Sequence, residues 1–337
     1  MSEPGQPRLT GWPLFLAALS VVLLVQTLFV TSYVGALHAP KPHNLRLGVV
    51  GTSPLPTAVG TQFSLKLIPY ADEQAARNAI DQRQVAAGFV SGPQRSTLIV
   101  APAGGPAIAT AVGNAFGVAA AALKQKLDVE QVHPLQSGDS AGGVSFFVTM
   151  ALVVGGYLAS TVAMIFGGAA TRHGRLAALA GASAIGALLT YVIASRAYGA
   201  LPSDKFFALW GLFTLVMMAV AFATAALQTL FGAAGTLIVV ISFVIFGAPS
   251  AGGAVPSPFL PGLWRTIGPY LPAGAGTTAT RNTLYFDAND IGRSLLVLAA
   301  YLVVGALVVI AVRRKTQGLS EGEAEASEAA AAAVIVA

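Results

Sequence analysis

Six apolar segments dominate the pattern of hydrophobic and polar residues along this chain. A helix needs about 20 apolar residues to cross about 30 Å of hydrocarbon, because lipid cannot satisfy an exposed backbone. The fourth and fifth segments share one stretch, Phe206 to Ala248, which holds no charged residue and predicts a helical hairpin with its turn at 231–235. The predicted spans are 12–37, 144–170, 176–197, 206–230, 233–248 and 291–312.

Basic residues indicate which side of the membrane each end of the chain faces. Six cations flank one side of the six predicted spans: Arg8, Arg172, Arg175, Arg313, Arg314 and Lys315. The positive-inside rule assigns that side to the cytoplasm. Lys41 and Arg46 follow the first span on the other side, but long translocated domains are largely exempt from the rule. We therefore predict a multi-pass protein of the plasma membrane with both termini cytoplasmic.

The first apolar segment has an alternative interpretation as a signal peptide, because Ala36 and neighbouring small residues resemble a cleavage site. Its apolar run is longer than the usual core of such a peptide, and one arginine is its only charged flank. An uncleaved anchor is the favoured interpretation.

Between residues 38 and 143 the pattern changes to that of a small α/β domain. Asp72 is placed to cap one helix, and a long apolar helix is predicted from Pro106 to about Lys126. Alternating strands and helices argue for two or three layers. We expect this domain to be extracytoplasmic, between the first and second spans. The predicted strands are 45–50, 63–68, 85–90, 97–100 and 129–135.

The turn at Gly104, Gly105 and Pro106 has two interpretations. A strand, a Gly-Gly turn and a helix N-terminus can hold an anion or a phosphate. The same turn can simply pack the helix against its strand, and no Gly-Lys-Ser/Thr or Gly-x-Gly-x-x-Gly pattern follows it. The packing interpretation is favoured.

Residues 249–290 are predicted to form an amphipathic outer loop. Its apolar side chains, among them Leu263, Trp264 and Tyr270, are too frequent for a free loop and too interrupted by proline for a span. We expect this stretch, with Arg265, to lie in the outer membrane interface or to re-enter the membrane. The alternative is a loop that packs on the outer domain.

Composition supports the membrane assignment, since 55% of the 337 residues are hydrophobic and 10% are charged, against about 25% charged in soluble domains. The net charge of +5 is concentrated beside apolar segments, which favours an orientation signal over nucleic-acid binding. Gln228 is a polar residue within a predicted span, and it is expected to bond between helices or to line a polar route. The predicted spans hold no Asp or Glu, so nothing indicates an ion path.

The sequence offers no candidate for catalysis. It has no cysteine, and its four histidines lack the spacing of metal ligands. No nucleophile and base, and no pair of carboxylates, converge in the pattern. We expect no enzyme activity, no cofactor and no metal. The short N-terminal segment 1–11 and the acidic, alanine-rich tail 313–337 are predicted to be cytoplasmic.

Two parts of the chain carry short motifs of note: AARNAI at 75–80 with VAAGFV at 85–90, and LPGLWR at 260–265 with GPYLP at 268–272 followed by Arg281-Asn282. These stretches resemble the type-2 ABC exporter permeases, and most closely the bacterial branch that includes the phage infection protein. The resemblance implies a dimeric permease, as homodimer or heterodimer, that exports a lipid-like or amphipathic compound with a separate ATPase subunit.

In such a permease Arg172, His173 and Arg175 would form a loop that couples to the ATPase. The chain departs from the family there, because this loop is short and about ten polar residues precede the first span. Positive-inside anchoring explains these cations equally well. The alternative function is a non-transporting membrane receptor or scaffold whose outer domain binds a cell-envelope component or a partner protein. Membrane lipids are expected partners in either case.

Overall fold

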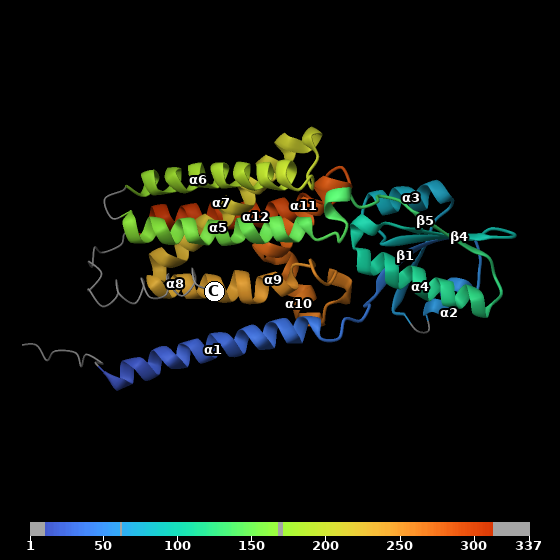
Figure 1. Cartoon of the computed structure of the whole chain (residues 1–337), viewed down its shortest axis with the longest axis horizontal. Helices are drawn as coiled ribbons and strands as arrows, with labels where there is room; N and C mark the ends of the chain where they lie inside the picture. Colours follow the sequence, from blue (N-terminus) through green and yellow to red (C-terminus); the bar gives the residue numbers. More distant parts are fainter. Residues whose placement is uncertain (1–10, 61–62, 168–170, 313–337) are drawn as a thin grey trace, which may run out of the picture.

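The computed structural model describes residues 11–60, 63–167 and 171–312, and in them six helices are long and apolar enough to cross a membrane (Figure 1). A small α/β region lies at one end of the helical bundle. The predictions of six long apolar helices and a separate α/β region are confirmed. The six are α1 (Trp12–Leu37), α5 (Val144–Phe166), α6 (Arg172–Val192), α7 (Phe206–Phe231), the helix from α8 (Ala233–Val239) to α9 (Gly247–Ser250), and α12 (Gly292–Ala311).

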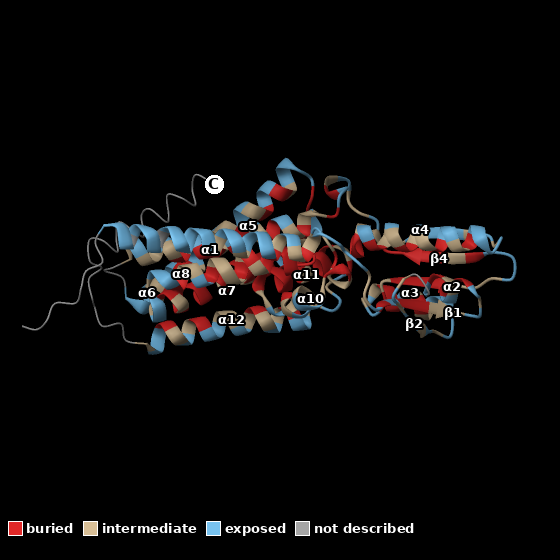
Figure 2. Ribbon diagram, turned by 90° about the horizontal axis from the view of Figure 1, so that it is seen from below, coloured by how far each residue is buried: buried red, intermediate tan, exposed pale blue. Residues whose placement is uncertain are grey.

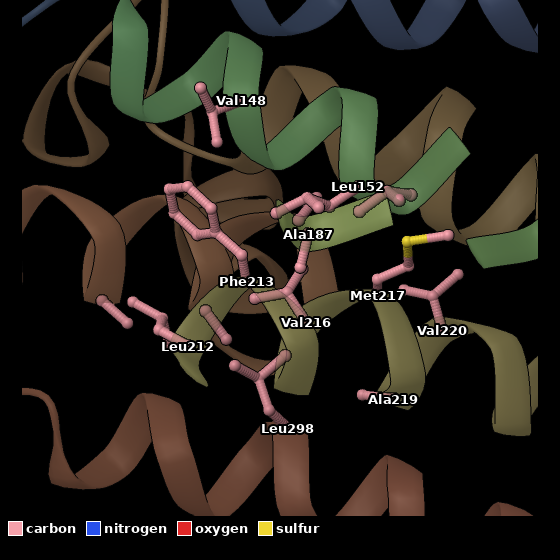
Figure 3. Close-up of a cluster of buried hydrophobic side chains, with 14 of the residues drawn as sticks. Val148, Leu152, Ala187, Leu212, Phe213, Val216, Met217, Ala219, Val220 and Leu298 are labelled. Atoms are coloured by element: carbon pink, nitrogen blue, oxygen red, sulfur yellow. The ribbon is translucent and has the colours of Figure 1, made fainter. Parts of the chain in front are cut away.

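The helix α7 lies at the centre of the bundle and packs against α5, α6 and α12. Its buried side chains meet those of its neighbours in one apolar core (Figure 3). A Cβ added at Gly156 of α5 would lie 2.6 Å from the carbonyl oxygen of Met217, and one at Gly305 of α12 would lie 2.6 Å from the backbone of Phe222. Glycine at these positions therefore allows α5 and α12 to approach α7 closely, as small residues do in membrane helices.

Apolar side chains also cover the outside of the bundle. Phe166 and Phe207 are 81% and 79% exposed, and much of α1 faces outward (Figure 2). The helix α1 contacts the bundle through α9 and through the π-helical segment η5 (Val240–Phe246). An apolar outer surface on helices of this length is typical of a multi-pass membrane protein.

The sheet of the α/β region has the strand order β2-β1-β3-β4-β5, with β3 and β4 antiparallel and the other neighbours parallel. One helix, α3 (Glu73–Asp81), covers one face, and α2 (Leu55–Gly60) and α4 (Pro106–Ala122) cover the other (Figure 1). The domain therefore has three layers. The strands are β1 (Leu45–Val50), β2 (Leu65–Pro69), β3 (Ala87–Val90), β4 (Ser96–Val100) and β5 (Leu127–Gln131).

Local sequence explains these elements well. Asp72 caps α3, since its carboxylate accepts a hydrogen bond of 2.8 Å from the amide of Ala75. Leu98 and Val100 of β4 pack on the side of α4, whereas Ile99 packs on the side of α3. The predicted strand 129–135 is shifted, because β5 pairs with β4 over residues 127–131.

Two boundaries of the bundle differ from the sequence prediction. The third long helix begins at Arg172, not at 176, because the Thr171 hydroxyl caps it by accepting a hydrogen bond of 3.1 Å from the amide of Gly174. Residues 249–290 are largely helical and not a loop, since α10 (Gly262–Ile267) and α11 (Pro272–Tyr285) lie within them. Most of the residues of α11 are buried among α5, α7 and α12. The predicted segments 1–11 and 313–337 lie, except for Gly11, outside the described residues.

Candidate functional site

The three residues predicted for ATPase coupling lie at the end of the bundle that is remote from the α/β region, called the far end below (Figure 1). They form the first turn of α6, where Arg172 and His173 are exposed and Arg175 is half-buried. Arg172 donates a hydrogen bond of 2.8 Å to the carbonyl of Ile310 in α12. Cations are unfavourable beside a helix N-terminus, so the local helix does not explain why they are there.

Gln228 is fully buried near the far end, where four helices meet. Its Oε1 accepts hydrogen bonds from Ser160 at 3.0 Å and from Arg175 at 3.1 Å. Its Nε2 donates to Thr161 at 3.1 Å and to Thr236 at 3.0 Å. Of the two roles expected for this residue, these contacts match bonding between helices, because α5, α6, α7 and α8 all contribute to them.

The four residues predicted to lie in the membrane interface between the last two spans differ in what surrounds them. Leu263 and Tyr270 are more than half exposed. Trp264 packs on α1, where its Nε1 donates to Ser32 at 3.2 Å. A Cβ at Gly35 would lie 2.9 Å from the Trp264 ring, so glycine makes room for it. Arg265 instead lines a cavity described below.

Two phenylalanines from the same region extend into the α/β region, one on each face of its sheet. Phe259 packs in the core under α4, with its ring centroid 6.4 Å from that of Phe63. Phe286 is 1% exposed and packs in the core under α3, with its ring centroid 4.5 Å from that of His133. Packing on the outer domain was the alternative expected for residues 249–290, and here it occurs on both faces of the sheet. We call this contact the phenylalanine clamp.

The helix α11 brings polar groups into the bundle. A Cβ at Gly276 would lie 2.7 Å from Thr149 of α5 and 3.2 Å from Val216, which is ten residues into α7, or about 15 Å from its start. Thr277 and Thr280 are fully buried, and within the described ranges their hydroxyls have no hydrogen-bond partner. Buried polar groups without partners are rare in proteins and call for an explanation.

A cavity of about 420 Å³ separates the α/β region from the adjacent end of the bundle, and we call it the junction cavity. Its lining includes residues from β1, from the segment after α3, from α10 and α11, and from the start of α12. Asp290 is the one carboxylate among the described residues that line it. Five arginines line it as well: Arg46, Arg83, Arg265, Arg281 and Arg293.

Burial disfavours the charged form of two of these arginines, Arg83 and Arg281. Arg281 is 9% exposed and donates a hydrogen bond of 3.0 Å to the carbonyl of Gly252. The Arg83 guanidinium lies 4.4 Å from the centroid of the Phe286 ring. Burial, and then the positive charge of Arg281, lower the pKa of Arg83 to about 10. Burial also lowers the pKa of Arg281.

A second, polar groove of about 360 Å³ lies at the end of the strands that is remote from the bundle (Figure 1). It is lined by the segments that follow β1 and β3, including Ser53 and Ser91, and by Lys126. Arg95 also lines it but is paired with Asp128 at 2.7 Å. Across the described ranges, no group of three or more His, Cys, Asp or Glu residues is placed to hold a metal ion.

No protein-family model matches the sequence, and no curated protein matches it significantly. The functional argument therefore rests on the geometry of this chain. Sequence reasoning identified Gln228 and Arg265 but missed the junction cavity, because its arginines are spread from residue 46 to residue 293. They share no signal in the sequence, since four lie outside the predicted spans and Arg293 lies at the start of the last one.

Proposed function

We propose that this chain is the permease subunit of an ABC-type exporter that moves a lipid-like or amphipathic compound and is powered by a separate ATPase. The observation that carries the proposal is α11, a polar helix inserted into the bundle among α5, α7 and α12. At about 21 Å it is too short to cross a membrane. Buried polar groups at membrane depth mark functional positions by default.

The insertion also supports the resemblance to the type-2 exporter permeases. The Pro-rich stretch that carries part of the resemblance includes α10 and leads into α11. The hydroxyls of Thr277 and Thr280, set in an otherwise apolar interior, suit the polar part of an amphipathic compound better than an ion.

The proposal orients the α/β region outside the cell and the far end of the bundle in the cytoplasm. Arg172 and Arg175 at the far end follow the positive-inside rule in this orientation. The exposed side chains of Arg172 and His173 are then available to an ATPase subunit. A dimer of the permease, with itself or with a related chain, would provide two such surfaces.

Recovery of an ATPase tests the proposal. The full chain is solubilised from its native membrane in mild detergent and pulled down, and a nucleotide-binding subunit is expected with it. The double variant Arg172→Ala/His173→Ala should lose that subunit, whereas Arg196→Ala, in the π-helical segment Ile193–Ala197 that follows α6, should retain it. Repeated absence of any nucleotide-binding subunit with the unaltered chain would contradict the permease function.

A receptor or scaffold is the second candidate, and the polar groove beyond β1 and β3 favours it. In parallel sheets, ligands bind beyond the carboxyl ends of the strands, and β1 and β3 are parallel neighbours. If the chain is a receptor, substituting Ser91 and Lys126 should abolish binding of an envelope component, and no ATPase should accompany the chain.

A further inference from the structure

Positive charge predominates in the lining of the junction cavity. Five guanidinium charges against the one carboxylate charge of Asp290 leave a net charge of +4. None of the five arginines forms an ion pair with any described carboxylate. Asp290 attracts Arg83 and the buried Asp139 attracts Arg281, but the excess of fixed cations still creates a positive potential within the cavity.

The positions of Arg83 and Arg281 carry an electrostatic cost. The two charges repel each other, as the lowered pKa of Arg83 reflects, and both side chains are removed from much of the solvent. Their hydrogen-bond acceptors are neutral carbonyls, that of Gly104 for Arg83 at 3.4 Å and that of Gly252 for Arg281 at 3.0 Å, and burying a charge costs free energy. An anion between them would neutralise the repulsion and accept hydrogen bonds from both.

Neutral donors complete the lining. Asn282 is 1% exposed, and one terminal atom of its amide, placed as Oδ1, has no partner among the described residues. An amide can turn its NH₂ group toward an anion. The buried Nδ1 of His43 is also without a partner in the described part of the chain. Buried Ser294 lies in the first turn of α12, where the helix dipole also favours negative charge.

We propose that the junction cavity binds a phosphate group, either as free phosphate or as the head group of an anionic phospholipid. Arginine recognises phosphate through paired N–H donors, and the volume lies within the range of about 300–1,000 Å³ that is typical of small-molecule sites. Arg293 begins the last apolar helix and stacks on exposed Tyr270 at 4.5 Å, so the site is level with one end of the spans. The inference does not require an ATPase and stands apart from the proposed export.

Thermal unfolding of the detergent-purified full chain, in a phosphate-free buffer, tests the site. Three ligands are titrated separately at matched ionic strength: inorganic phosphate, phosphatidylglycerol, and diacylglycerol with the same acyl chains. A rise in the unfolding temperature with phosphatidylglycerol alone identifies a lipid head group, and a rise with inorganic phosphate alone identifies the free ion. A rise with both identifies a site open to either. No rise with any ligand, or equal rises with diacylglycerol and phosphatidylglycerol, would overturn the proposal.

Two arginine variants locate the binding. Arg83→Gln and Arg265→Gln should each weaken binding at least about tenfold, because each removes a charged hydrogen-bond donor. Arg196→Gln, which changes an exposed arginine outside the cavity at the same end of the bundle, should bind like the unaltered chain.

The same variants separate binding from structural support. Without ligand, Arg83→Gln should unfold at about the same temperature as the unaltered chain, because it removes both the repulsion with Arg281 and the contact with the Phe286 ring. A phosphate response that persists unchanged in both Arg83→Gln and Arg265→Gln would place the bound anion elsewhere and refute this site.

Discussion

Gln228 shows how one side chain can connect several helices of this bundle. Both ends of its amide are fully used, with two hydrogen bonds accepted by Oε1 and two donated by Nε2. In an apolar interior such a side chain is stable only when these bonds are made. Its position near the far end also links it, through Arg175, to the residues proposed to face the ATPase.

Replacing Gln228 with Leu should lower the stability of the bundle. The expected loss is about 1–2 kcal/mol, because hydrogen bonds between membrane helices contribute about 0.6–1.7 kcal/mol each and the partners can partly rearrange. The unfolding temperature in detergent measures it. Gln26→Leu on the exposed face of α1 is the matched control and should change little. If both substitutions lowered the unfolding temperature equally, Gln228 would not stabilise the bundle through its bonds between helices.

At the scale of elements, the segment between the last two spans connects the two parts of the molecule. Its α11 lies in the bundle, and the phenylalanine clamp of Phe259 and Phe286 holds the α/β region from both faces of the sheet. Backbone contacts strengthen the connection, for example the 2.9 Å hydrogen bond from the amide of His43 to the carbonyl of Pro258. A displacement of the α/β region would therefore act directly on α11.

Shortening a phenylalanine side chain of the clamp should destabilise the α/β region. Phe286→Ala should cost about 3–5 kcal/mol, the range for a buried phenylalanine, and should increase hydrogen exchange in α3 before exchange in α7 changes. Hydrogen exchange followed by mass spectrometry measures both helices. Phe166→Ala is the control, because that side chain is 81% exposed. Uniform loss of protection in α3 and α7 would indicate that the two parts unfold together and are not joined by a local clamp.

For the whole molecule, the orientation of the chain in the membrane decides whether the junction cavity and the α/β region lie outside the cell. Along the chain, α1 leads into the α/β region, and the five further long helices follow it. The far end carries the exposed cations of α6 and the α/β region lies at the opposite end (Figure 1). The proposed orientation places them on opposite sides of the membrane.

The absence of cysteine from the sequence allows this orientation to be tested with single cysteines. Gln94→Cys, on an exposed loop of the α/β region, should react with a membrane-impermeant maleimide in intact cells. His173→Cys should react only after the cells are opened, because the first turn of α6 is then inside. The opposite pattern of labelling would invert the arrangement, and with it the side on which the ATPase is expected.

The sequence by itself determined where the long helices and the α/β region lie. Runs of apolar residues and capping residues such as Asp72 act over a few positions, so they locate elements without reference to the rest of the chain. The hairpin turn is an example, since α7 ends at Phe231 and α8 begins at Ala233, within the predicted turn. The sequence also marked Gln228 as a polar residue in an apolar segment.

Only the tertiary structure decided which residues meet. Hydropathy indicates that a residue is buried but not what lies against it. The helices that surround α11, the two cores that Phe259 and Phe286 enter and the helices that Gln228 joins could therefore not be predicted. The junction cavity is the clearest case. Arg83 follows a short helix of the α/β region, and Arg281 belongs to α11. The two charges lie close enough to repel each other because residues next to α11 pack into the α/β region.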